Sequence, residues 1–275
     1  MTIPAITLNN GVTIPQLGFG VFKVPDEETA VAVQGAIDAG YRSIDTAAVY
    51  FNEVGVAQGI AASGVARDEL FITTKVWNSA QGYDSTLEAF DESAERLRLE
   101  QVDLYLIHWP TPEFDTYLET WRALETLVKD GRIRAAGVSN FQPAHLKRVL
   151  ENSDLVPAIN QIELHPGLQQ NELRALHAEH GIATEAWSPL GRGAILDDPL
   201  ITPIAERVGR TPAQVVLRWH IQLGNVVIPK SVTPSRIREN IDVFDFDLTD
   251  EDMATIATMD RGQRIGPNPD DFNVR

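Results

Sequence analysis

The regular alternation of short apolar segments with helical patterns is the feature that most constrains how this chain folds. Eight apolar segments have the length of a strand, and a helical pattern follows each of them. Strands that are apolar throughout are typical of a parallel sheet whose faces are covered by helices. The expected strands are residues 17–21, 42–46, 71–76, 103–109, 133–140, 158–164, 183–189 and 226–230.

Residue types typical of helix ends support this division of the chain. Gly40 and Gly131 are expected to end helices, and Thr211-Pro212 is expected to begin one. Ser85 has a glutamate three residues later and predicts a capping box at the start of a helix. Helices are expected near residues 25–39, 52–62, 85–97, 121–130, 143–151, 170–180, 199–208, from 212 onward, 234–243 and 250–259.

Eight strand–helix units predict an α/β fold, a (β/α)8 TIM barrel. No composition shift or flexible linker divides the chain, so we expect a single domain over residues 1–275. Residues 6–15, around Asn10-Gly11, predict an N-terminal β-hairpin, and the helices after Lys230 are extra C-terminal elements.

A doubly wound open sheet is the alternative fold. Such sheets usually bind nucleotides through a G-x-G-x-x-G sequence after the first strand. Here Gly18-Phe19-Gly20 is followed by Val21-Phe22-Lys23, so that fingerprint is missing and the barrel is favoured.

Composition and charge limit the classes of partner. The chain is 43% hydrophobic and 23% charged, as in an ordinary soluble protein with a sizeable core. A formal net charge of -16 argues against nucleic acid or an anionic membrane as partner. A basic region followed by an apolar stretch is missing from the first residues, and no apolar run is long enough to span a bilayer. We therefore expect a cytoplasmic protein. No amphipathic stripe demands a partner subunit.

Metal and thiol chemistry find little support in the sequence. The chain has no cysteine, which excludes disulfides, thiolate catalysis and cysteine-ligated zinc. His177 and His180 are three residues apart on an expected helix, where they are better explained by its C-terminal end than by a metal. We expect no metal site.

Residues suited to binding and catalysis, most of them polar, stand at the ends of the expected strands, where a (β/α)8 barrel carries its active site. Any one of them could cap a helix or face solvent, but the whole set favours a functional site. Its members are Gly20, Phe22, Asp45, Lys75, His108, Ser139, Asn140, Gln161, Trp187, Ser188, Lys230 and Ser231.

Asp45, Tyr50, Lys75 and His108 would form a proton-transfer group if the fold brings them together. A lysine beside Tyr50 would lower the pKa of the phenol toward neutrality, and Asp45 would keep that lysine charged. His108 could donate a hydrogen bond to a substrate oxygen, or it could be a buried core histidine. Tyr50 alone could equally be an aromatic residue at the rim.

The segment of residues 228–240 predicts a phosphate site. Thr233-Pro234 is a good helix start, which places Arg236 in the first turn, where the helix dipole disfavours a cation. A phosphate bound by Lys230, Ser231 and Arg236 would resolve this conflict. A solvated arginine is an equally good explanation from this segment alone.

These motifs resemble the aldo-keto reductase family over essentially the whole chain, and the nearest resemblance is to the bacterial 2,5-diketo-D-gluconate reductase group. Trp187 stands where many members of the family have a tyrosine. The matching segments are Gly40 to Tyr50, Thr74-Lys75, Leu104 to Pro110, Gly137 to Phe141 and Ile228 to Ser231.

The resemblance implies an enzyme that reduces an aldehyde or ketone with NADPH, and Asp45, Tyr50, Lys75 and His108 would be its catalytic tetrad. Hydride would pass to the carbonyl carbon while Tyr50 protonates the oxygen as general acid. Lys75 and Asp45 would tune that acidity, and His108 would orient the carbonyl. The resemblance further implies a monomer.

The resemblance also implies contacts to the cofactor. Trp187 would stack on the nicotinamide, whose amide Ser139, Asn140 and Gln161 would hold. Lys230, Ser231 and Arg236 would bind the 2′-phosphate and favour NADP over NAD. The remaining expected contacts are Gly20, Val21, Phe22, Asp45, Ser188, Leu190, Val232 and, at the adenine, Asn240.

The implied substrate pocket is walled by aromatic residues, although Trp77 and Trp109 could also be plain packing. The tail after Met259 is short, which suggests an open pocket for small or polar carbonyls, such as methylglyoxal or the keto sugar acid 2,5-diketo-D-gluconate. The expected substrate contacts are Phe22, Tyr50, Trp77, His108 and Trp109.

Two other functions remain open. Lys75 could form a Schiff base with a carbonyl substrate in a barrel lyase or aldolase. The chain could also be a cofactor-binding regulatory barrel with weak turnover, although the complete tetrad counts against that reading.

Overall fold

The apolar segments of the sequence form parallel strands that are buried on both faces. The computed structural model describes residues 3–275. In β5 and β6 every residue is buried, because the barrel interior covers one face and helices cover the other. The strands of this sheet are β3 (Phe19–Gly20), β4 (Ser43–Asp45), β5 (Phe71–Val76), β6 (Val102–Ile107), β7 (Ile133–Ser139), β8 (Ile159–Glu163), β9 (Ala183–Trp187) and β10 (Val226–Val227).

The sheet closes on itself into a barrel. Its strands lie side by side in chain order from β3 to β10, all of them parallel. Leu17 then pairs in parallel with Val227, the Gly18 amide donates to the Val227 carbonyl at 2.8 Å, and the Val227 amide donates to the Gln16 carbonyl at 2.9 Å. The predicted (β/α)8 barrel is confirmed, and the doubly wound alternative is wrong because consecutive strands are neighbours throughout.

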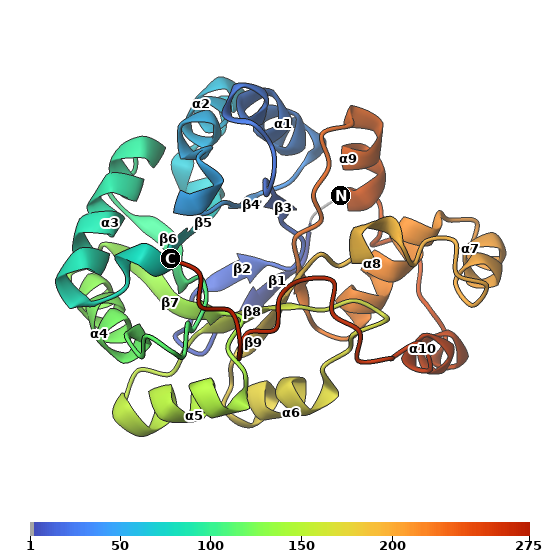
Figure 1. Cartoon of the computed structure of the whole chain (residues 1–275). Helices are drawn as coiled ribbons and strands as arrows, with labels where there is room; N and C mark the ends of the chain where they lie inside the picture. Colours follow the sequence, from blue (N-terminus) through green and yellow to red (C-terminus); the bar gives the residue numbers. More distant parts are fainter. Residues whose placement is uncertain (1–2) are drawn as a thin grey trace.

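Helices form a ring around the sheet (Figure 1). The predicted ends at Gly40, which has φ 110°, and at Thr211, whose side chain accepts from the Gln214 amide, are confirmed. The helices are α1 (Asp26–Ala39), α2 (Glu53–Ser63), α3 (Tyr83–Leu97), α4 (Tyr117–Lys129), α5 (Pro143–Asn152), α6 (Asn171–Glu179), α7 (Thr202–Val208), α8 (Pro212–Gln222), α9 (Pro234–Ile241) and α10 (Asp250–Ala257), with short 3-10 helices η1 (Ala48–Tyr50), η2 (Arg67–Glu69), η3 (Asn78–Ala80) and η4 (Gly191–Gly193).

The predicted capping box at Ser85 is wrong. Helix α3 begins two residues earlier, and Gly82 with φ 126° is its N-terminal cap. The Ser85 hydroxyl instead donates to the Gln81 carbonyl at 3.1 Å, as serine side chains inside helices commonly do. Only a glycine tolerates the backbone angle at the true start, and this signal outweighs the serine–glutamate spacing.

The N-terminal hairpin covers the end of the barrel at which the strands begin. Strands β1 (Ala5–Thr7) and β2 (Thr13–Pro15) pair antiparallel around a turn in which Gly11 has φ 85°, which confirms the predicted hairpin. Leu8 and Ile14 are buried against the first residues of several barrel strands, including Phe71 and Ile159. This end is therefore sealed by apolar packing, and polar chemistry is left to the opposite end.

The chain after α10 crosses the opposite end of the barrel, where the strands finish (Figure 1). The amide of Arg261 donates to the carbonyl of Gly167 at 3.1 Å, and the Asn78 side chain donates to the carbonyl of Val274 at 2.7 Å. Residues 261–275 thus lie over the loops that follow β8 and β5, although they are far from both in sequence.

Gly59 in α2 and Gly35 in α1 differ in the space around them. Substituting each by alanine tests how tightly α1 packs on α2. A Cβ atom on Gly59 of α2 would lie 2.7 Å from both the Ala30 carbonyl oxygen and Val33 Cβ of α1, whereas a Cβ on Gly35 would meet nothing within 4 Å. We predict that Gly59→Ala lowers the free energy of unfolding by about 1–3 kcal/mol, because the helices must separate.

Gly35→Ala serves as the matched control in the same urea unfolding experiment. It should raise the free energy of unfolding by about 0.5–1 kcal/mol, because alanine loses less backbone entropy in a helix. A stabilising effect of Gly59→Ala would contradict the close approach of these helices.

Candidate functional site

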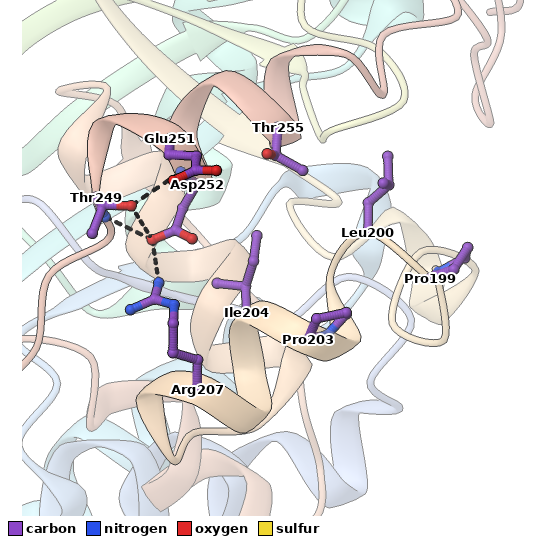
Figure 2. A pocket seen from close by; sticks show the side chains of 9 residues that line it. All are labelled: Pro199, Leu200, Pro203, Ile204, Arg207, Thr249, Glu251, Asp252 and Thr255. Atoms are coloured by element: carbon purple, nitrogen blue, oxygen red, sulfur yellow. Dashed lines mark hydrogen bonds and ion pairs between the residues drawn. The ribbon is translucent and has the colours of Figure 1, made fainter.

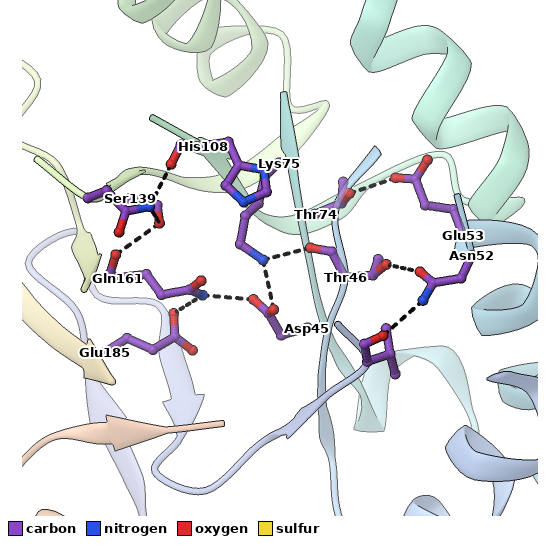
Figure 3. A network of polar contacts seen from close by, with 12 residues as sticks. Asp45, Thr46, Asn52, Glu53, Thr74, Lys75, His108, Ser139, Gln161 and Glu185 are labelled. Carbon is purple, nitrogen blue, oxygen red and sulfur yellow. Dashed lines mark hydrogen bonds and ion pairs between the residues drawn. The ribbon is translucent and has the colours of Figure 1, made fainter. Parts of the chain in front are cut away.

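Asp45, Lys75 and His108 converge where β4, β5 and β6 end (Figure 3). Tyr50 lies beside Lys75 and His108. Asp45 is the last residue of β4, Lys75 is the last but one of β5, and His108 directly follows β6, while Tyr50 ends η1. Lys75 Nζ donates to Asp45 Oδ1 and to the Thr46 carbonyl, both at 2.7 Å. The predicted proton-transfer group is thus assembled around a buried ion pair.

The Tyr50 ring lies close to the Lys75 cation and to two other rings. Lys75 Nζ is 5.2 Å from its centroid. The His108 ring meets it edge to face at a centroid distance of 5.6 Å, and the Phe22 ring lies 5.0 Å away. Tyr50 therefore belongs to the site rather than standing alone at the rim.

Burial, rather than the lysine, dominates the acidity of Tyr50. Burial raises the pKa of the Tyr50 hydroxyl to about 12, although the charge of Lys75 acts in the opposite direction. Lys75 lowers this pKa, as expected, but does not bring it toward neutrality, because the cost of a phenolate in this surrounding exceeds the attraction of the ammonium group. The phenol is therefore protonated at neutral pH.

Lys75 is charged and His108 is neutral. Burial lowers the pKa of Lys75, but the charge of Asp45 and its hydrogen bond raise it above its usual range. Burial and the nearby Lys75 charge hold the pKa of His108 well below 6.5. A neutral imidazole has one N–H to donate, and His108 Nδ1 is buried without a hydrogen-bond partner among the described residues.

Asn52 fixes the loop that carries Tyr50. Its side-chain amide donates to the carbonyls of Val21 and Val24 at 2.9 and 3.0 Å, and its oxygen accepts from Thr46 Oγ1 at 2.7 Å. Asn52 is fully buried, so these bonds tie the loop after β3 to the loop after β4. Phe22 and Tyr50 are positioned together as a result.

Gln161 extends the network into the barrel interior. Its side-chain amide donates to Asp45 Oδ2 at 2.8 Å and to Glu185 Oε2 at 2.9 Å (Figure 3). Ser139, Gln161 and Glu185 are register partners on neighbouring strands, so their side chains point into the barrel at one level.

Trp187 is linked to Ser139 and to the His108 backbone by hydrogen bonds through Asn140. Its indole N–H donates to Asn140 Oδ1 at 2.8 Å, and the Asn140 amide donates to Ser139 Oγ and to the His108 carbonyl, both at 3.0 Å. Asn140 has φ 63°, a left-handed conformation that asparagine tolerates better than most residues. These bonds fix the half-exposed indole at the end of β9.

Aromatic residues line the site beyond His108. The Trp77 ring meets the His108 ring edge to face at 5.2 Å. Phe272, from the C-terminal segment, packs on Trp109 at a centroid distance of 4.3 Å and on Trp77 at 6.4 Å. Trp77 and Trp109 are therefore brought to the site, with Phe272 beside them.

Glu163 anchors the C-terminal segment across the mouth. Its two carboxylate oxygens accept from the amides of Ile265 and Gly266, at 2.5 and 3.0 Å. A Cβ on Gly266 would lie 2.5 Å from the Trp187 ring, so the backbone passes directly over this indole. The expectation that a short tail leaves the pocket open is corrected, because residues 261–275 cross the mouth despite their length.

The N-terminus of α9 has the composition expected of an anion site. Arg236 occupies the third helical position, as predicted, and the first turn contains no acidic residue. Lys230 and Arg236 are exposed, and neither forms an ion pair within the described residues 3–275. Ser231 Oγ accepts from the Thr233 amide at 3.1 Å.

The other predicted cofactor contacts differ in exposure and in whether their backbone amides are already hydrogen-bonded. The Val21 amide donates to the Asp45 carbonyl at 3.1 Å, and the Gly20 amide donates to the Pro229 carbonyl at 3.2 Å. Asn240 is only 5% exposed, which leaves little of it available to a ligand, whereas Val232 is 45% exposed. Ser188 and Leu190 lie in the loop after β9.

The histidine pair on α6 is explained by packing. His177 is buried, with Nε2 hydrogen-bonded to Asn160 at 2.9 Å and Nδ1 to Thr184 at 2.8 Å, while His180 caps the helix. Residues 3–275 contain no group of three or more histidine, cysteine or acidic side chains that could hold a metal.

Sequence reasoning missed Glu185, Glu163 and Phe272. Glu185 had a signal, because a charged residue two positions before Trp187 on an apolar strand must face the same side as Trp187. Phe272 had none, because its tail has neither helical nor strand periodicity and only the fold brings it to Trp109.

A separate surface hollow of about 460 Å³ lies between α7 and α10 (Figure 2). None of the predicted site residues lines it. Its lining residues are Pro199, Leu200, Pro203, Ile204, Arg207, Thr249, Glu251, Asp252 and Thr255.

Comparisons with known proteins point to one family. The sequence model of the Aldo/keto reductase family matches residues 16–261. The glyoxal reductase of Bacillus subtilis (strain 168) is 55% identical over 268 residues, covering 97% of this chain and 96% of the relative. The methylglyoxal reductase DkgA of Yersinia pestis is 51% identical over 271 residues, covering 98% and 97%.

A solved structure supports the same assignment. A mutant of Gox0644 in complex with NADPH superposes with a TM-score of 0.95 at 50% identity, covering 99% of each chain.

The clamp made by Asn52 leads to a stability prediction. Asn52→Ala would leave two backbone carbonyls and the Thr46 hydroxyl without their partner in a buried place. We predict a loss of about 2–4 kcal/mol in the free energy of unfolding, measured by urea denaturation. Asn152→Ala removes a single exposed bond to the Arg148 carbonyl and should change stability by no more than about 0.5 kcal/mol. Equal effects of the two variants would show that the clamp does not hold this loop.

Proposed function

Because this chain belongs to the aldo/keto reductase family, we propose that it reduces an aldehyde or ketone to the alcohol with NADPH, using Tyr50 as the general acid. The family match confirms the resemblance found in the sequence, and with it an oxidoreductase that acts on carbonyl compounds. The narrower grouping with 2,5-diketo-D-gluconate reductases stays a prediction.

The observation that carries the proposal is the placement of a protonated phenol beside a charged lysine and a neutral histidine. A general acid for carbonyl reduction must hold its proton at neutral pH, and the pKa of about 12 caused by burial of Tyr50 meets this requirement. As the proton moves to the carbonyl oxygen, the Lys75 ammonium stabilises the phenolate that remains. His108 donates its N–H to the same oxygen and orients the carbonyl.

The residues of the mouth suit NADPH, which supplies the hydride when bound. Trp187 offers a half-exposed indole for the nicotinamide, and its hydrogen bond to Asn140, which in turn donates to Ser139, places an amide and a hydroxyl group near this indole. Gln161 would be the third group to hold the nicotinamide amide. The exposed cation Arg236, which forms no ion pair with any of residues 3–275 and lies at a helix N-terminus without acidic residues in its first turn, suits the 2′-phosphate.

The pocket suits small carbonyl compounds. Phe22, Trp77, Trp109 and Phe272 provide flat apolar walls, with His108 and Tyr50 as the polar groups. The reduction of glyoxal and methylglyoxal named for two relatives supports a small dicarbonyl substrate. A keto sugar acid remains the second candidate.

The geometry disfavours the Schiff-base alternative. A lysine nucleophile must be neutral and reachable. Lys75 has no exposed surface, its pKa is raised, and Asp45 and Thr46 both accept from its ammonium group.

The helices of residues 3–275 are all too short or too polar to cross a bilayer. A monomeric state, a cytoplasmic location and a single domain stay predictions.

Tyr50→Phe tests the role of the general acid. We predict that the variant binds NADPH like the wild type but loses about 10²–10⁴-fold in kcat, because its ring cannot donate a proton. The measurement is the loss of NADPH absorbance with methylglyoxal, 2,5-diketo-D-gluconate and an aromatic aldehyde. Tyr83→Phe, at an exposed tyrosine on α3, is the control. Full turnover by Tyr50→Phe would exclude this role, and no wild-type turnover with any carbonyl would exclude the reductase.

Arg236→Ala tests the phosphate contact. We predict that the Kd for NADPH rises about 10- to 100-fold while the Kd for NADH is unchanged, because only NADPH carries the 2′-phosphate. Quenching of tryptophan fluorescence measures both constants. Arg238→Ala, at an exposed arginine of the same helix, is the matched control. An equal loss of affinity for both cofactors would contradict the contact.

A further inference from the structure

The barrel interior contains a second carboxylate that the mechanism above leaves unused. Glu185 lies in β9 and is only 1% exposed. Its Oε2 accepts from the Gln161 amide at 2.9 Å, and its Oε1 is buried without a hydrogen-bond partner among the described residues (Figure 3). Burying a carboxylate with an unpartnered oxygen costs folding free energy, which suggests that Glu185 has a role other than stabilising the fold.

One amide group joins this carboxylate to the ion pair of the site. The Gln161 amide donates to Glu185 Oε2 and also to Asp45 Oδ2, while Asp45 Oδ1 accepts from Lys75. Two carboxylates therefore share one bridging amide and face one cation. The charged and titratable groups that interact electrostatically with Glu185 are Asp45 of β4, Lys75 of β5 and Tyr50 of η1.

Neutral Glu185 is the form that this surrounding favours near neutral pH. Burial, with the charge of Asp45 adding to it, raises the pKa of Glu185 to about 8. Asp45 already takes the charge of Lys75 and the second N–H of Gln161, so a second anion at Glu185 would lack compensation.

We propose that Glu185, which Gln161 joins to Asp45 and so to the Lys75 ion pair, adjusts the acidity of Tyr50 through its charge as it gains or loses its proton. The inference rests on the proposed function, because it concerns the proton that Tyr50 donates. When Glu185 is neutral, Asp45 is the only anion beside Lys75, and the ammonium group favours the phenolate. When Glu185 ionises, its negative charge disfavours the phenolate, and Tyr50 becomes a weaker acid.

The kinetic test follows the pH dependence of hydride transfer. Wild type and Glu185→Gln are mixed with methylglyoxal in single turnovers at saturating NADPH, and a deuterium isotope effect at the transferred position verifies that the chemical step is observed. We expect the wild-type rate constant for hydride transfer to fall about threefold to tenfold between pH 7 and pH 9.5. A fall of this size is expected if ionisation of Glu185 raises the pKa of Tyr50 by about one unit. Glu185→Gln, which cannot ionise, should lack this fall.

A matched control separates this effect from the general loss of a buried carboxylate. Glu53 is equally buried, but its oxygens accept from Thr74 Oγ1 at 2.6 Å and Arg96 Nε at 2.7 Å, on the helical side of the sheet. Glu53→Gln should keep the wild-type pH dependence. An unchanged fall in Glu185→Gln, or no fall in the wild type, would overturn the proposal.

A second measurement needs no turnover. Between about pH 4.5 and pH 8 the unfolded chain ionises Glu185 while the folded chain retains its proton, so rising pH destabilises the wild type in this window. The Tm of Glu185→Gln minus that of the wild type should therefore increase by about 5 °C or more from pH 5 to pH 8. A constant difference would show that Glu185 is already ionised and would overturn the proposal.

These readouts separate failure of the inference from failure of the proposed function. Wild-type turnover tests the reductase at every pH, and the Tm difference tests the proton on Glu185 whether or not turnover occurs. Should Glu185→Gln fail to fold, Glu185→Thr also lacks the ionisable group and takes its place in both experiments.

Discussion

Keeping the ammonium group of Lys75 charged inside the barrel is the constraint on which the rest of the site depends. Burial alone would neutralise it, so Asp45 and the Thr46 carbonyl must both lie at 2.7 Å. Removing one partner of such a pair generally costs about 3–5 kcal/mol. Asp45 therefore has to end β4 beside Lys75 of β5, and Gln161 has to satisfy its second oxygen. The network is assembled strand by strand because each polar group needs the next one.

Much of this site could be predicted from the sequence because parallel strands end at one edge. Asp45, Lys75 and His108 each stand at the end of an apolar run. A closed barrel brings such ends together regardless of the conformation of the loops. The start of α3 could not be predicted in this way, because a serine spacing competed with a glycine whose backbone angle decides the cap. The acidity of Tyr50 depends on burial, which spacing along the chain does not encode.

The C-terminal segment shows a second limit of sequence reasoning. Glu163 and Gly266 are 103 residues apart, yet one hydrogen bond between them places the tail over Trp187. The tail contributes Phe272 to the wall beside Trp109. Such contacts carry no local periodicity, so they follow from the closed barrel and from the position of its mouth. In such a pocket, the strand ends hold the polar residues in fixed positions, whereas the loops and the tail supply wall residues that can differ without changing the barrel.

The overall charge of the chain places a further condition on the cofactor site. A net charge of -16 repels an anionic dinucleotide at long range, so binding must gain its free energy from close contacts. In the proposed cofactor site, Lys230 and Arg236 would provide these contacts, at an exposed helix N-terminus that has no acidic residue in its first turn. Repulsion between exposed charges beyond about 8 Å is screened at physiological salt, whereas a direct hydrogen-bonded contact between Arg236 and a phosphate is screened much less. A local cationic site can therefore select a phosphate even on a strongly acidic protein.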